Sequence, residues 1–203
     1  MLTKNKDLHG NVPDKSPVVL LLIDVINDLE FEGNGSIVRS ARKMAPRIAG
    51  LKRRIEREGL VSIYVNDNFG RWKSDFSAQI EHCLHDNTCG SFLARTLTPE
   101  SSDYFVLKPK HSGFFSTTLD TVLRYLEAHT LILTGIAGDR CVLFTANDAF
   151  LRDYRILVPS DCVVSNTPKD NRNALALMRR VLGADTRRSD HLDLKGLKKK
   201  PAK

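Results

Sequence analysis

The sequence lacks any apolar run that approaches the roughly 20 residues needed to cross a bilayer as a helix. Residues 1–15 also lack the apolar stretch of a secretory signal peptide. These two absences exclude a membrane-spanning protein and predict a cytoplasmic one that makes no membrane contact.

Cysteine is scarce as well, and the four cysteines form neither a CxxC pair nor a dense framework: Cys83, Cys89, Cys141 and Cys162. Such usage is typical of reduced thiols in a reducing compartment, so no disulfide is predicted. Cys83, His85 and Cys89 are too irregularly spaced to indicate a zinc site.

Acidic residues are outnumbered, which gives a formal charge of +7. Residues 186–203 account for most of this excess, since they carry seven Lys or Arg against two Asp. We therefore interpret residues 189–203 as a basic, solvated C-terminal tail and do not expect a nucleic-acid partner. Residues 1–16 form a polar N-terminal extension. The remaining residues, 17–188, are enough for one domain with a sizeable core.

Within that domain, strand-like and helix-like segments alternate, which predicts a parallel sheet in an α/β fold. Residues 18–23 form a continuous apolar run, as expected for a central strand buried on both faces. Further strands are expected at 61–65, 104–107, 131–133 and 156–158, with a sixth at 185–187. Helices are expected at 37–58, 78–84, 117–128, 139–152 and 168–182, the last capped by Thr167 with Pro168 in the first position.

Three chemically useful residues lie where strands of this sheet end. Asp24 follows the first strand, Lys108 follows the third, and Cys141 lies one short turn beyond the fourth. Ligands of open parallel sheets bind at this edge. Each residue also has a structural interpretation: a loop cap, a surface ion pair and a buried cysteine. Together they supply a proton acceptor, a fixed positive charge and a nucleophile.

Cys141 is expected close to a helix start. Unpaired N–H groups and the positive end of the helix dipole lie there, so the position favours a thiolate and can receive an oxyanion.

Three segments together resemble the isochorismatase-like cysteine hydrolases: Leu22-Ile-Asp-Val-Ile-Asn-Asp-Leu29, Leu107-Lys-Pro-Lys-His-Ser-Gly-Phe-Phe-Ser116 and Thr134-Gly-Ile-Ala-Gly-Asp-Arg-Cys-Val142. The resemblance implies a three-layer α/β/α fold whose six-stranded, mostly parallel sheet has the order 3-2-1-4-5-6. The superfamily includes nicotinamidases, carbamoylsarcosine and ureidoacrylate amidohydrolases, and isochorismatases. It also implies a homo-oligomer acting on a small molecule.

Carried over to this sequence, the resemblance makes Asp24, Lys108 and Cys141 the catalytic residues. Lys110 is a competitor for the lysine position, but Lys108 directly follows the strand. The resemblance further implies a cis peptide before Ala137 and an oxyanion hole formed by the N–H groups of Ala137 and Cys141.

Nicotinamidases of this superfamily carry an Asp-x-His metal motif after the second strand. Asn68 stands at the position of that first His, so neither a metal nor another cofactor is expected here.

Retention of the cysteine favours hydrolysis of an amide, ureide or similar C–N bond through a thioester. Vinyl-ether hydrolysis and a catalytically silent scaffold with a basic tail remain alternatives. Gly138 stands where many relatives have Thr, which leaves the substrate class open. Candidate substrate-binding residues, for which core or surface roles are also open, are Phe31, Asn66, Trp72, Phe115 and Arg140.

Overall fold

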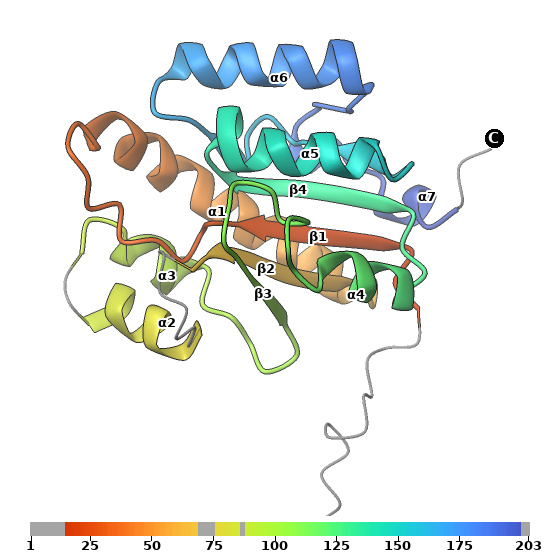
Figure 1. Ribbon diagram of the computed structural model, residues 1–203, viewed down its shortest axis with the longest axis horizontal. Helices are drawn as coiled ribbons and strands as arrows, with labels where there is room; N and C mark the ends of the chain where they lie inside the picture. Colours follow the sequence, from red (N-terminus) through yellow and green to blue (C-terminus); the bar gives the residue numbers. More distant parts are fainter. Residues whose placement is uncertain (1–14, 69–75, 86–87, 200–203) are drawn as a thin grey trace, which may run out of the picture.

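A parallel sheet of six strands forms the centre of the computed structural model, which describes residues 15–68, 76–85 and 88–199 (Figure 1). The strands are β1 (Val18–Ile23), β2 (Val61–Asp67), β3 (Tyr104–Lys108), β4 (Thr130–Ile136), β5 (Arg155–Leu157) and β6 (Val163–Val164). Five of them follow the order β3-β2-β1-β4-β5, and every pair is parallel. The predicted α/β class and this strand order are confirmed.

The sixth strand lies in a different segment from the one expected. Because β5 is only three residues long, the end of β4 is left open, and β6 pairs there with Gly135 and Ile136. The expected strand at 185–187 makes a single parallel bridge, between Asp185 and Leu157.

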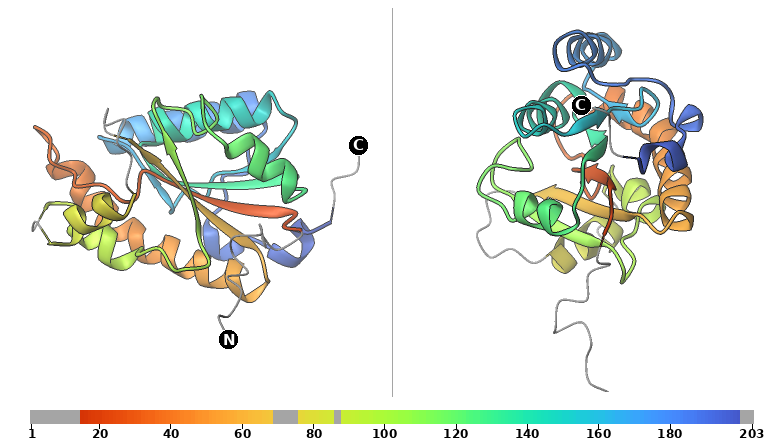
Figure 2. Two further views of the ribbon diagram at one scale, coloured as in Figure 1. Left: turned by 60° about the horizontal axis from the view of Figure 1, so that its bottom comes forward. Right: turned by 90° about the vertical axis from the view of Figure 1, so that its right-hand side faces the viewer.

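Helices cover both faces of the sheet, as the two views of Figure 2 make clear. They are α1 (Gly35–Arg57), α2 (Phe76–His85), α3 (Ser91–Thr96), α4 (Leu119–Tyr125), α5 (Leu143–Phe150), α6 (Pro168–Leu182) and α7 (Leu194–Leu197). Buried residues of α1, α3 and α7 pack in one cluster, and those of α4, α5 and α6 in another. The three-layer arrangement follows from these two clusters. No helix in the described part of the chain is long and apolar enough to cross a membrane.

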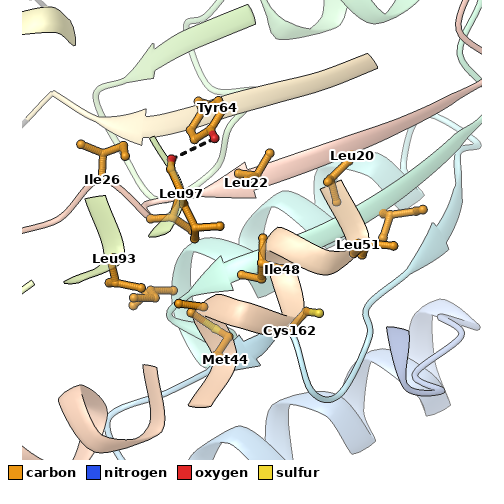
Figure 3. Close-up of a cluster of buried hydrophobic side chains, with 14 of the residues drawn as sticks. Leu20, Leu22, Ile26, Met44, Ile48, Leu51, Tyr64, Leu93, Leu97 and Cys162 are labelled. Carbon is orange, nitrogen blue, oxygen red and sulfur yellow. Dashed lines mark hydrogen bonds between the residues drawn. The ribbon is translucent and has the colours of Figure 1, made fainter. Parts of the chain in front are cut away.

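The strand β1 supplies both clusters, because successive side chains point to opposite faces and all six residues are buried. Figure 3 shows Leu20 and Leu22 facing Ile48 and Leu51 of α1. The hydroxyl of Tyr64 donates to the carbonyl of Leu97 at 2.9 Å, which satisfies a polar group that the core would otherwise leave unpaired (Figure 3).

Several helix ends match the sequence signals. Thr167 Oγ1 accepts from the N–H of Asp170 at the start of α6, with Pro168 in the first helical position. The chain leaves α1 at Gly59, whose φ of +65° is a left-handed conformation that glycine adopts without strain. The π-helical turn Gly138–Val142 precedes α5, so the helix expected from 139 begins irregularly.

The prediction of a solvated tail from residue 189 needs correction. Leu192, Leu194 and Leu197 are buried against the α1 side of the core. The guanidinium of Arg54 donates to the carbonyls of Ser189 and Leu192, which ties this segment to α1. Leucines spaced among lysines were enough to anchor residues 189–199 to the domain.

Candidate active site

The carboxyl ends of three strands, β1, β3 and β4, bring Asp24, Lys108 and Cys141 together. Lys108 is the last residue of β3, Asp24 follows β1, and Cys141 lies in the turn after β4. The Nζ atom of Lys108 lies 2.9 Å from Oδ2 of Asp24 and donates to Sγ of Cys141 at 3.5 Å. The three side chains that the sequence pattern singled out are therefore in direct contact.

The backbone at the end of β1 sets the position of Asp24. Its N–H donates to the carbonyl of Val65 at 2.9 Å, and its φ is +50°, uncommon for a residue with a side chain. On the neighbouring β4, Gly135 has φ +112°, and a Cβ there would lie 2.0 Å from the carbonyl oxygen of Ile23. Only glycine therefore lets β1 and β4 approach this closely beside the site.

Asp67 is a member of this site that the sequence analysis did not single out. It ends β2, between the strands that carry Asp24 and Lys108. Its backbone N–H donates to Oδ1 of Asp24 at 2.7 Å, and its own Oδ2 lies 3.5 Å from Nζ of Lys108. The rule that identified Asp24, a polar residue at a strand end, would also have found Asp67.

His111 is a second residue that was missed. Its Nδ1 lies 3.6 Å from Sγ of Cys141, the side chain is exposed, and the ring packs against Phe144 with centroids 5.4 Å apart. Thr145 holds this loop on α5, because its Oγ1 donates to the carbonyl of Cys141 and accepts from the N–H of Gly113. His111 lies within the segment Leu107–Ser116 that resembles the family, but its position in that segment does not predict contact with the sulfur of Cys141.

Burial dominates the electrostatics of the site. Desolvation raises the pKa of Asp24 above its usual value, although Lys108 and the hydrogen bond with Cys141 work against the shift. Desolvation also acts to lower the pKa of Lys108, but the adjacent Asp24 and Cys141 outweigh it, so that pKa is raised. The ammonium is therefore the favoured form of Lys108.

The thiol of Cys141 differs from the expectation of a thiolate at a helix start. Desolvation, reinforced by the negative charge of Asp24, raises the pKa of Cys141 to about 12. Lys108 lowers this pKa only in part. The resting site therefore holds a thiol, which needs a base in contact with it to become a nucleophile.

The turn before Cys141 has the backbone feature that the family resemblance implies, since the Ile136–Ala137 peptide bond is cis. The carbonyl of Ala137 accepts from the N–H groups of Arg140 and Val142, which orients the turn. A Cβ on Gly138 would lie 2.5 Å from Oδ1 of Asn171 and 2.8 Å from a methyl of Val163. Gly138 is thus a close packing position as well as one without a hydroxyl.

The five candidate substrate-binding residues have different surroundings. Phe31, Phe115 and Arg140 are exposed, as a pocket wall open to solvent requires. Asn66 is fully buried, and its Nδ2 makes a structural contact by donating to the carbonyl of Ile26. Its Oδ1 has no hydrogen-bond partner in the described chain. Trp72 lies outside the described residues. Their roles toward a substrate stay predictions.

In the described ranges, no group of three or more His, Cys, Asp or Glu side chains is arranged to hold a metal ion. Cys83 is buried and Cys89 is exposed, so these two thiols occupy different environments.

Comparisons with known proteins agree with the fold and the family. Residues 18–189 match the model of the isochorismatase domain. An uncharacterised isochorismatase family protein, YaaI of Bacillus subtilis (strain 168), is 39% identical over 171 residues, which cover 84% of this chain and 93% of that protein. The ureidoacrylate amidohydrolase RutB of Methylobacterium radiotolerans is 40% identical over 92 residues, 45% of this chain and 36% of that protein. The crystal structure of N-carbamoylsarcosine amidase from Thermoplasma acidophilum superposes with a TM-score of 0.68 at 28% identity, covering 87% and 98% of the two chains.

Proposed function

The chain belongs to the isochorismatase family of hydrolases, and we propose that it cleaves a small-molecule amide, ureide or similar C–N bond through a thioester on Cys141. The observation that carries this proposal is the contact of one buried ammonium with both a carboxylate and a thiol. The names of two relatives, an amidohydrolase and an amidase, support the same reaction class.

In the first half of the reaction, Asp24 accepts the proton of Cys141 while the sulfur attacks the carbonyl carbon of the substrate. The raised pKa of Asp24 makes it a stronger base than an ordinary carboxylate, and it is in hydrogen-bond contact with the thiol. The tetrahedral intermediate then collapses, the C–N bond breaks, and Asp24 returns the proton to the departing nitrogen.

In the second half, water attacks the thioester and Asp24 accepts its proton, so the acid again becomes a base. The C–S bond then breaks, the acid product leaves, and Asp24 gives the proton it took from water to the sulfur of Cys141. Lys108 stays charged throughout, because its raised pKa keeps the ammonium form at neutral pH. It balances the negative charge that passes between Asp24 and the sulfur.

The N–H groups of Ala137 and Cys141 are the proposed donors to the tetrahedral oxyanion. Loss of one such donor typically reduces the rate by about 10²–10³. Backbone donors cannot be removed by a simple side-chain change, so this part of the mechanism depends on the geometry of the turn.

Vinyl-ether hydrolysis is the second candidate function. It needs no nucleophilic sulfur, whereas this chain keeps a thiol in contact with a base and an ammonium. A silent scaffold is a third candidate, but a buried carboxylate–ammonium–thiol set is expensive to desolvate without a chemical use.

Ammonia release from a panel of small primary amides and ureides tests the proposal, with the wild type and Cys141→Ala compared under identical conditions. We expect at least one substrate that the wild type hydrolyses and Cys141→Ala does not. Enolpyruvyl turnover that survives in Cys141→Ala would favour vinyl-ether hydrolysis. Tail-dependent, salt-sensitive polyanion binding without any turnover would favour the scaffold.

We further propose that the enzyme needs no metal, that it is located in the cytoplasm, and that it forms a homo-oligomer. Large exposed apolar side chains are concentrated on α5, its C-terminal cap and α6: Phe144, Phe150, Leu151, Leu177 and Val181. A second copy of the chain is the proposed partner for these side chains, since large apolar groups left exposed on two helices in contact with each other favour association. Light scattering that gives the mass of a single chain would contradict this assignment.

A further inference from the structure

A cavity of about 770 Å³ lies on the molecule beside β6, in a part that the proposed chemistry does not use. Residues of α1, of β6 and of the start of α6 line it. The strand β6 packs against both α1 and α6. Its volume is in the range of small-molecule sites.

Four cations border this cavity: Lys43, Arg47, Arg172 and Arg188. The single acid in its wall, Asp161, already accepts from the N–H and hydroxyl of Ser189. It also lies 3.5 Å from Arg188. The cavity therefore carries a strong excess of positive charge.

Three of the four cations have no anionic partner anywhere in the described chain: Lys43, Arg47 and Arg172. Lys43 and Arg47 stand four residues apart on α1, a spacing at which like charges repel. Other cations of the same protein, such as Lys52 and Lys198, do form ion pairs. All four cations are exposed to solvent, so they are stable without a partner, but the unpaired positive charge favours binding of an anion from outside the chain.

The chemistry of the wall indicates the class of anion. Arginine guanidinium groups bind phosphate oxygens in pairs, and a hydroxyl such as that of Ser160 can add a further donor. Met44, Val163 and Val164 contribute an apolar surface to the same cavity. A ligand that satisfies both parts carries a phosphate group and an organic body.

We propose that this cavity between α1 and α6 binds a small organic phosphate. The site is independent of the proposed hydrolysis, but it adjoins the turn that carries Cys141. Ser165 and Asn171 line the cavity; Ser165 Oγ accepts from the N–H of Asp139, and Asn171 packs on Gly138. A bound phosphate therefore restrains the turn Gly138–Val142 from behind.

Calorimetric titration at physiological salt, with inorganic pyrophosphate and with adenosine monophosphate as probes, tests the site. The test variant is Arg47→Gln/Arg172→Gln. The matched control is Arg53→Gln/Arg179→Gln, which removes two exposed arginines from the same two helices without touching any wall residue. Thermal melting of both variants checks that they remain folded.

We expect the wild type to bind both probes, the test variant to bind at least a hundredfold more weakly, and the control to stay within twofold. The expected loss is about tenfold for each charge-assisted contact. Absence of binding by the wild type would overturn the site. Equal weakening in the control would overturn it too, because the attraction would then be diffuse. Tighter binding of single-stranded DNA, weakened equally in both variants, would instead identify a general polyanion surface.

Hydrogen exchange tests the link to the turn without any turnover assay. With adenosine monophosphate bound, we expect the N–H of Asp139 and its neighbours to exchange severalfold more slowly. Unchanged exchange in a saturated protein would overturn the restraint on the turn. The binding result and the hydrolysis result remain separate from this one.

Discussion

The ammonium of Lys108 lies 2.9 Å from the carboxylate of Asp24, with side-chain exposures of 0% and 7%. Each group removes the main cost of burying the other, and Asp67 adds a second carboxylate 3.5 Å from the same ammonium. The thiol of Cys141 lies against this pair. The stability of the domain and the chemistry of the site therefore depend on the same contact.

Lys108→Met should abolish turnover and lower the free energy of unfolding by about 3–5 kcal/mol at neutral pH, because it leaves Asp24 buried without a counter-charge. The pKa of Asp24 then rises further, so the folded state holds a proton that the unfolded state releases. Stability is therefore lost as the pH rises from the pKa of Asp24 in the unfolded state to its higher pKa in the folded state, and it is regained in acid. Chemical unfolding at several pH values measures this.

The matched control is Lys110→Met, since Lys110 is an exposed neighbour that the sequence left as a competitor. Loss of activity in Lys110→Met with retention in Lys108→Met would reverse the assignment of the catalytic lysine.

Alkylation of Cys141 by iodoacetamide should accelerate continuously from pH 7 to pH 10, about tenfold for each pH unit. Its pKa of about 12 means that the thiolate fraction keeps increasing over this whole range. Peptide mass spectrometry separates Cys141 from the exposed Cys89. A rate that already levels off near pH 7 would mean a preformed thiolate, as the helix-start argument alone suggested.

His111→Asn should lower kcat/KM by ten- to hundredfold without changing the melting temperature. The imidazole is exposed and lies against the sulfur of Cys141, so it can transfer a proton to this reacting atom or form a hydrogen bond with it. Steady-state kinetics on a substrate from the amide panel measures the effect. Activity equal to the wild type would reduce the 3.6 Å contact to simple packing.

Gly138→Thr should destabilise the protein by about 1–3 kcal/mol, because its Cβ would displace Asn171 and Val163. Asn171 donates to the carbonyl of Val163, so it cannot move without losing that hydrogen bond. Thermal melting measures the change. Gly50→Ala is the control: its Cβ has space within α1, so it should stabilise the helix by about 0.5–1 kcal/mol. A Gly138→Thr variant as stable as the wild type would show that the turn can shift.

Local signals predicted the parts of the fold that local chemistry determines. Residues 18–23 are uniformly apolar and form the fully buried β1, and the Thr167-Pro168 pair marks the start of α6. The helix α3 was missed because six residues give no periodic pattern. The sixth strand was misplaced because β6 depends on the shortness of β5, which is a property of the sheet.

The sequence likewise predicted which residues meet at the site, but not all of their properties. The positions of Asp24, Lys108 and Cys141 follow from strand ends that parallel pairing must bring together. The state of the thiol could not be predicted, because its pKa depends on burial and on the distance to Asp24. The contact of His111 depends on how its loop folds onto Thr145.

The measurement that tests the covalent mechanism most directly is mass spectrometry of the enzyme, quenched in acid during turnover of a substrate found in the amide panel. We predict that the peptide containing Cys141 gains the mass of the substrate acyl group, and that hydroxylamine removes it as expected for a thioester. Turnover with no adduct on Cys141, together with activity retained in Cys141→Ser, would contradict the account.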